Sequence, residues 1–268
     1  MIEGVRRVAG EAGFGGALER LAGHRRLDAA ALARFAGVAG AEVTAVLRGG
    51  TPDGVLLRRL APALGVRTAD LFATAGVAVP DDLAPLDPSA GWDVPALVRR
   101  ALALAPEQRE ALREFAKSLP EEEPARPAPP TPAHEDYPAG PGGALMRMAR
   151  NRNLGWSATA KTFLLLTGRY WAASSYGRVG RGLTPLTPDL VADFSTVLGV
   201  PAGTLAAITG VAPLPVAVEP DPAVHGVAEL VWDVRRLTAD RFLQVLDLAE
   251  RTPDGPGPGG QSAPGSHG

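Results

Sequence analysis

The sequence predicts an all-α protein that contains one helical unit twice. Gly15-Gly16-Ala17-Leu18 recurs as Gly142-Gly143-Ala144-Leu145, and Leu64-Gly65-Val66 recurs as Leu198-Gly199-Val200. Apolar residues follow a helical period in both copies, and no segment shows a convincing strand pattern. Solenoid repeats are much shorter than this spacing. We therefore expect a duplicated domain, with a few residues inserted in the second copy.

Five short helices are predicted in the first copy. Asp28 and Asp53 are suitable N-caps, and Gly37 is a suitable residue to end a helix. The expected elements are Ala17–Arg25, a helix between Asp28 and Gly37, Ala41–Leu47, a helix from Asp53 to Leu64, and Ala69–Ala73.

The second copy repeats these signals. Ser157 is predicted to cap a helix over Ala158–Leu166, which Thr167-Gly168 ends. The next helix is expected over Arg169–Val179, and Thr187-Pro188 begins a further one.

The predicted order of segments is a five-helix domain, a helical pair, a linker, and then the second domain with its own pair and a tail. The ranges are 14–77, 92–119, 120–141, 142–211, 224–251 and 252–268. The acidic, Pro-rich linker Pro120–Pro141 and the Gly/Pro/Ser-rich tail are expected to be disordered. Such a linker would leave the two domains without a fixed mutual orientation. The helical pairs are expected to pack on the core, or to bind a second copy or a protein partner.

Positive charge is concentrated on the repeated units. Residues 142–211 contain seven basic and two acidic residues, and residues 15–77 contain eight basic and five acidic ones, although the chain has a net charge of −2. This distribution is what a nucleic-acid surface requires.

Two short helices joined by a Gly-containing turn form a helix-turn-helix. Leu27–Val38 resembles the opening of the lambda-repressor-like (XRE) family, Val43–Pro52 its recognition-helix end, and Leu60–Phe72 its closing helices. The resemblance covers residues 14–77 and 142–211. It implies two tandem helix-turn-helix domains in a transcription regulator whose third helix enters the major groove of double-stranded DNA.

The two copies differ at the positions expected to face DNA. In the first copy these positions are Ala39, Gly40, Ala41 and Glu42, which offer almost no donors to base edges. The second copy is therefore expected to be the main DNA reader. Its candidate DNA-binding residues are Ser157, Lys161, Arg169, Ser174, Ser175, Arg178 and Arg181. Ser157 is included because it marks a helix N-terminus that could hold a phosphate.

Some of these assignments have alternatives that involve no DNA contact. Tyr170, Trp171 and Tyr176 could stack on DNA, but aromatic residues on a short helix are more often core. The Ala-rich third helix of the first copy instead fits a protein-interaction or scaffold protein that keeps the fold without DNA binding.

Several other classes are not expected. The chain has no Cys, its four His residues lack metal-ligand spacing, and no catalytic constellation is present. We therefore expect no enzyme activity, metal or cofactor. No apolar run reaches the 18 residues of a membrane span, and the N-terminus lacks a signal-peptide pattern, so a cytoplasmic location is expected.

Overall fold

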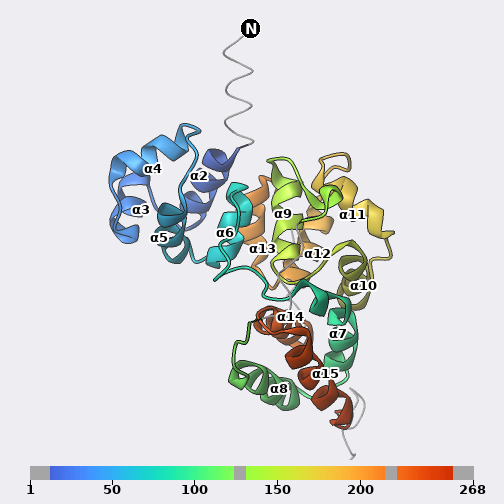
Figure 1. The fold of residues 1–268 in the computed structure, drawn as a ribbon. Helices are drawn as coiled ribbons and strands as arrows, with labels where there is room; N and C mark the ends of the chain where they lie inside the picture. Colours follow the sequence, from blue (N-terminus) through green and yellow to red (C-terminus); the bar gives the residue numbers. More distant parts are fainter. Residues whose placement is uncertain (1–12, 124–130, 215–221, 256–268) are drawn as a thin grey trace, which may run out of the picture.

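The computed structural model describes residues 13–123, 131–214 and 222–255, and within these ranges all regular structure is helical (Figure 1). The first unit consists of α2 (Phe14–His24), α3 (Ala29–Ala36), α4 (Gly40–Leu47), α5 (Gly54–Leu64) and α6 (Thr68–Ala75). The second unit consists of α9 (Pro141–Arg150), α10 (Trp156–Thr167), α11 (Ala173–Gly180), α12 (Pro188–Leu198) and α13 (Ala202–Thr209). The four-helix group consists of α7 (Val94–Leu102), α8 (Pro106–Ser118), α14 (Pro222–Val234) and α15 (Ala239–Arg251). Two short 3-10 segments are η1 (Pro88–Trp92) and η2 (Ala133–Glu135).

Local signals fix the helices of the first unit. The Asp28 side chain accepts a hydrogen bond from the Ala31 N–H at 2.7 Å, and the Asp53 side chain accepts one from the Leu56 N–H at 2.8 Å. Gly37 ends α3 in the left-handed conformation, with φ of 65°, which glycine adopts without steric cost. The predicted caps at these three positions are confirmed.

An arginine contact recurs at the same place in both units. Arg25 Nε donates to the Leu64 carbonyl at 2.7 Å, and Arg152 Nε donates to the Leu198 carbonyl at 3.0 Å. Each arginine follows the first helix of its unit and binds the C-terminal end of the fourth. The duplication seen in the sequence therefore extends to individual hydrogen bonds.

The two units pack directly on each other, in a reciprocal manner. The last helix of each unit lies on the first helix of the other, α6 on α9 and α13 on α2 (Figure 1). Arg20 Nε donates to the Ala207 carbonyl at 2.8 Å, and its counterpart Arg147 donates to the Ala73 carbonyl, also at 2.8 Å. The units are thus related by an approximate two-fold axis and have a fixed orientation, contrary to the prediction from the linker.

A buried ion pair joins the units on one side of this interface. Arg152 and Asp70 are 0% and 1% exposed, and two parallel hydrogen bonds of 2.9 and 2.8 Å join the guanidinium to the carboxylate. Arg152 also donates to the carbonyls of Leu198 and Met148. Because the charges and donors are satisfied, the pair can be buried without a large penalty.

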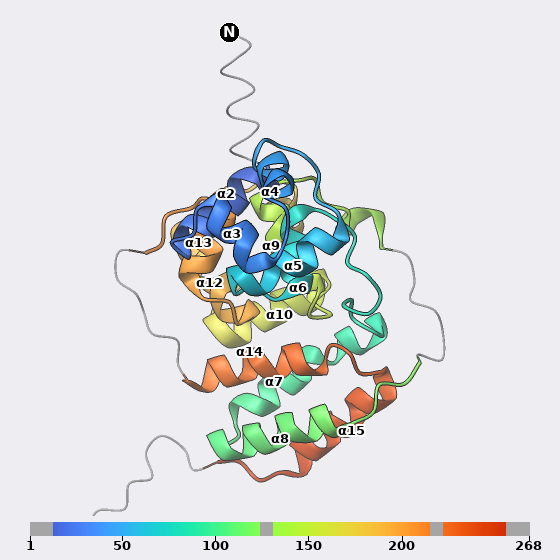
Figure 2. The same ribbon diagram turned by 90° about the vertical axis from the view of Figure 1, so that its left-hand side faces the viewer.

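The four-helix group is built from both helical pairs. Its main contacts run between the pairs, with α14 on α8 and α7, and α15 on α7 and α8 (Figure 2). Arg113 Nε on α8 lies 2.9 Å from Asp233 Oδ2 on α14, and Arg100 Nε on α7 donates to the Ala249 carbonyl at 2.8 Å. The pairs therefore pack on each other within one chain.

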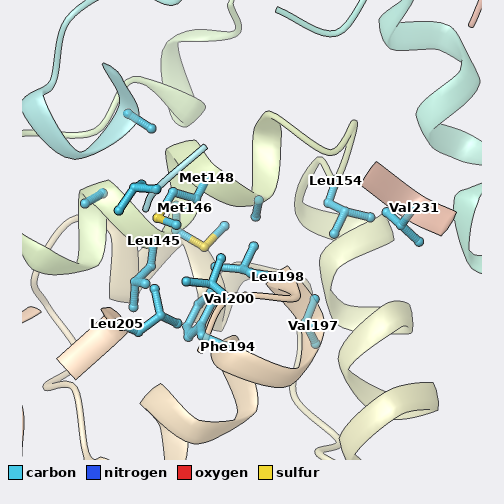
Figure 3. Packing of buried hydrophobic residues seen from close by; sticks show 14 of the residues in the cluster. Leu145, Met146, Met148, Leu154, Phe194, Val197, Leu198, Val200, Leu205 and Val231 are labelled. Carbon is cyan, nitrogen blue, oxygen red and sulfur yellow. The ribbon is translucent and has the colours of Figure 1, made fainter. Parts of the chain in front are cut away.

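The second unit and the four-helix group share one apolar core. Helix α10 contacts α7, and α12 contacts α14. Figure 3 shows Leu154, from the loop after α9, beside Val231 of α14. The labelled core residues are Leu145, Met146, Met148, Leu154, Phe194, Val197, Leu198, Val200, Leu205 and Val231.

The predicted linker is partly packed. Glu121 forms an ion pair with Arg236 at 2.7 Å, and Tyr137 is buried against the second unit. The prediction of disorder across the whole of Pro120–Pro141 is therefore wrong for these parts, while residues 124–130 lie outside the described ranges. In the tail, the Gly255 N–H donates to the Ala103 carbonyl at 2.9 Å, and residues 256–268 also lie outside.

Candidate nucleic-acid interface

Helices α10 and α11 form the outer end of the second unit. Helix α10 ends at Gly168, whose φ is 72°, and the chain turns through to Ala172 before α11 begins at Ala173. The predicted helix over Arg169–Val179 is thus wrong in its first residues, because these form the turn rather than a helical start.

An aromatic cluster fixes α11 against its neighbours. The ring of Tyr176 lies 4.6 Å from that of Phe163 on α10, and Phe163 lies 4.8 Å from Phe194 on α12. Tyr176 is fully buried, as the core interpretation predicted, whereas Tyr170 in the turn is 85% exposed. Only Tyr170 of these two is free to contact a ligand.

Small residues let α11 approach the aromatic residues of the linker and α10. A Cβ at Gly177 would lie 2.2 Å from the Trp156 ring, and one at Gly180 would lie 2.4 Å from the Tyr137 ring. Trp156 Nε1 donates to the Tyr137 hydroxyl at 2.5 Å. Burial raises the pKa of Tyr137 to about 12. The glycines therefore set the position of α11.

The outward face of α11 carries polar side chains. Ser174 and Arg178 are exposed, one helical turn apart, and Ser175 is partly exposed. Lys161 is exposed on α10. Within the described residues neither Lys161 nor Arg178 forms an ion pair, and Arg178 makes only a 3.5 Å contact with the Leu183 carbonyl. With Ser157, which is also exposed on α10, five of the seven candidate residues thus lie on α10 and α11 with side chains open to a ligand.

The remaining candidates have other partners. Arg169 lies 2.9 Å from Asp189 and also pairs with Asp193, so it ties the turn to α12. Arg181 donates to the His134 carbonyl at 2.8 Å and stacks on Trp156. These guanidinium groups hold the unit together.

Ser157 does not cap α10. The N-cap residue is Gly155, and the Glu135 carboxylate accepts from the Trp156 N–H at 3.3 Å. A carboxylate therefore already occupies the N-terminus where a phosphate was expected. The sequence did not reveal this contact because Glu135 lies in the segment assigned to a disordered linker.

Most basic side chains of the second unit bind other groups of the protein and are not free to bind a ligand. Of its seven basic residues, Arg147 and Arg152 bind across the unit interface, Arg169 binds within the unit, and Arg181 binds the segment before it. Counting charges in the sequence therefore overestimates the cationic surface. Arg150, Lys161 and Arg178 are the basic residues of the unit without an ion pair among residues 13–123, 131–214 and 222–255.

The first unit presents a different face at the equivalent place. The counterparts of Ser174 and Arg178 on α4 are Ala41 and Ala45, both exposed. The counterpart of Ser175 is Glu42, whose carboxylate accepts from the Ala39 N–H at 2.9 Å. Helix α4 thus offers no side-chain cation within its own span.

Helices α4 and α11 have equivalent positions in the paired units. Figure 1 shows them at opposite ends, both on the side away from α8 and α15. The reciprocal packing of α6 on α9 and α13 on α2 fixes this arrangement.

No family model, curated protein or solved structure was found to match the chain. None of the described helices is long and apolar enough to cross a membrane.

Proposed function

We propose that the protein is a sequence-specific DNA-binding transcription regulator in which the second unit is the main reader. The observation that supports this most directly is the outward face of α11, where Ser174, Ser175 and Arg178 provide donors and an unpaired cation. A helix that enters the major groove needs such side chains to contact base edges and phosphates. In this proposal α3–α4 and α10–α11 are helix-turn-helix elements, and the protein acts in the cytoplasm.

The test replaces Arg178 and Lys161, the two exposed cations of the second unit that form no ion pair in the described residues. Arg178→Glu with Lys161→Glu should weaken binding to a selected duplex and lower the slope of log affinity against log salt by about 0.9 for each lost phosphate contact. Arg99→Glu is the matched control, because Arg99 is an exposed arginine on α7. Arg181 is left unchanged because its loss would disturb Trp156 and His134. Equal affinity of the double variant and the control would contradict the proposal.

A gain-of-function variant tests the role of the first unit. Ala45→Arg places a cation on α4 at the position of Arg178 in α11, and Ala45 is exposed. If both units face one duplex, this variant should bind DNA more tightly and with a steeper salt dependence. An unchanged affinity would restrict DNA contact to the second unit.

The second candidate function is protein interaction through the first unit. Phe35 at the end of α3 is 68% exposed, and Val55 on α5 is 63% exposed. Together with Ala41 and Ala45 of α4, these side chains make the first unit more apolar than a DNA reader requires. Phe35→Ser should abolish partner capture under this alternative while leaving DNA affinity unchanged.

A further inference from the structure

Trp232 of α14 lies where the two units meet the four-helix group. Three guanidinium groups stack on its ring: Arg235 with its Cζ 3.9 Å from the ring centre, Arg67 at 4.3 Å and Arg152 at 4.9 Å. Arg67 comes from the first unit and Arg152 from the second. Such cation–π stacking is favourable, but it leaves the N–H donors of each guanidinium to be satisfied at its edge.

Two of these guanidinium groups have carboxylate partners, and the third has none in the described part of the chain. Arg67 pairs with Glu229 at 2.5 Å, and Arg152 pairs with Asp70. Arg235 is only 8% exposed, its Nε has no hydrogen-bond partner, and within the described residues its guanidinium forms no ion pair. Buried charges are normally paired, because an unpaired one loses its hydration without compensation.

Arg235 lines a pocket between the ends of α8 and α14. The pocket has a volume of about 260 Å³, and its wall includes Lys117, Leu119, Trp232 and Arg236. This volume is a little below the range of roughly 300–1,000 Å³ for drug-sized ligands. A smaller molecule would fit, with Arg235 beside it.

The other charges of the pocket are already balanced. Glu121 is paired with Arg236 at 2.7 Å, and Asp233 is paired with Arg113 at 2.9 Å. Lys117 lies 2.9 Å from Glu114 and 3.9 Å from Asp233. Burial, followed by the neighbouring Arg236, lowers the pKa of Arg235 to about 10, so the group still carries its charge at neutral pH. The uncompensated charge in the pocket is therefore positive.

We propose that this pocket binds a small oxyanion, a carboxylate or a phosphate, through the two terminal Nη groups of Arg235, which unlike Nε are not closed off from solvent. Arginine presents parallel N–H donors that match the oxygens of both groups. Lys117 also lines the pocket, but its charge is shared with Glu114 and Asp233, so its attraction for the anion is weaker. Because Trp232 also contacts Arg67 and Arg152, a ligand bound here would lie next to the junction of both units. This makes the pocket suitable for an effector of the proposed DNA-binding function, while anion binding itself does not depend on that function.

Calorimetric titration of the full chain tests the proposal. Inorganic phosphate and succinate are titrated separately at constant ionic strength and without DNA. We expect saturable binding of one equivalent of at least one of them, which identifies the preferred group. Arg235→Met should weaken that binding about tenfold or more, as expected for loss of a charged hydrogen bond. Arg99→Met, at an exposed arginine of the same four-helix group, should leave it unchanged.

The variants also report on folding. Without anion, Arg235→Met should unfold at a temperature no lower than the wild type, because it removes an unpaired buried charge. If it does not fold, Lys117→Met serves instead, since Lys117 is exposed and its loss should weaken anion binding by a smaller factor. Absence of saturable binding by both anions, or equal binding by wild type and Arg235→Met, would overturn the proposal. Loss of DNA binding alone would not affect it.

Discussion

At the scale of single residues, the arginines of this chain differ more than the sequence reveals. Arg152 is fully buried against Asp70, Arg169 binds two carboxylates, and Arg178 extends into solvent. In the sequence all three count equally as positive charge on a repeated unit. The partners of Arg152 and Arg169 lie 82 and 20 positions away along the chain, and no local pattern specifies such contacts. This is why the sequence predicts the basic unit but not its free cations.

The buried pair of Asp70 and Arg152 should be strongly coupled. Asp70→Ala leaves the guanidinium buried without its counter-ion and should cost about 3–5 kcal/mol of unfolding free energy. Arg152→Met should cost a similar amount. The double variant Asp70→Leu with Arg152→Met should cost less than the sum of the single changes. Denaturant unfolding measures all three, and additive losses would show that the pair does not interact.

An exposed ion pair provides the control for this comparison of single and double variants. Asp247 and Arg251 lie 2.8 Å apart on α15, and both are largely exposed. Asp247→Ala should change the unfolding free energy by less than about 1 kcal/mol.

Tyr137 should make the protein sensitive to alkaline pH. Burial raises its pKa in the folded state to about 12, compared with about 10 in the unfolded chain. The stabilisation is complete below pH 10 and is lost as the pH rises toward 12, by at most about 2.7 kcal/mol. Tyr137→Phe should therefore show a flatter stability profile between pH 10 and 12 in denaturant titrations. An equally steep profile in the variant would contradict this assignment.

At the scale of helices, local signals account for most of the fold. The caps at Asp28 and Asp53 and the left-handed Gly37 fix helix ends through neighbours in the sequence, so these ends could be predicted. The start of α11 could not, because residues 169–172 form a turn that is fixed by Arg169 binding to α12. Tyr137 was missed for a related reason, since a Pro-rich segment gives no periodic signal even where one side chain is buried.

The approach of α11 to Trp156 makes Gly177 sensitive to substitution. Gly177→Ala would place a Cβ 2.2 Å from the indole ring, so Trp156 or α11 must move. We expect a loss of about 1–3 kcal/mol from overpacking, measured by thermal or denaturant unfolding. Gly23→Ala in α2 is the matched control, because no atom lies within 4 Å of its added Cβ. That change should be neutral or stabilising by up to about 1 kcal/mol. Equal effects of the two would exclude a role for the Trp156 contact.

At the scale of the whole molecule, the two halves should hold together without a covalent connection. Helix α6 packs on α9, α13 on α2, and α14 on α8, so each half covers apolar surface of the other. After cleavage at a protease site introduced between residues 123 and 131, the fragments should elute together in size-exclusion chromatography. Asp70→Ala in the cleaved protein should weaken this association. Such a loss would show that the fragments associate through the native interface and not through nonspecific aggregation. Fragments that elute apart at micromolar concentration would contradict the packing of the units.

The reciprocal pairing within one chain removes a constraint that applies to every homodimer. In a homodimer each substitution appears on both sides of the dyad, so no bond can exist on one side only. Here the counterpart of Asp70 is Thr204, which carries no charge, so the bond between the Asp70 carboxylate and the Arg152 guanidinium has no equivalent on the other side of the axis. The halves can therefore diverge separately under selection, and dilution cannot separate them. For the proposed regulator, α4 and α11 need not read the same bases, and we expect its preferred sites to lack palindromic symmetry.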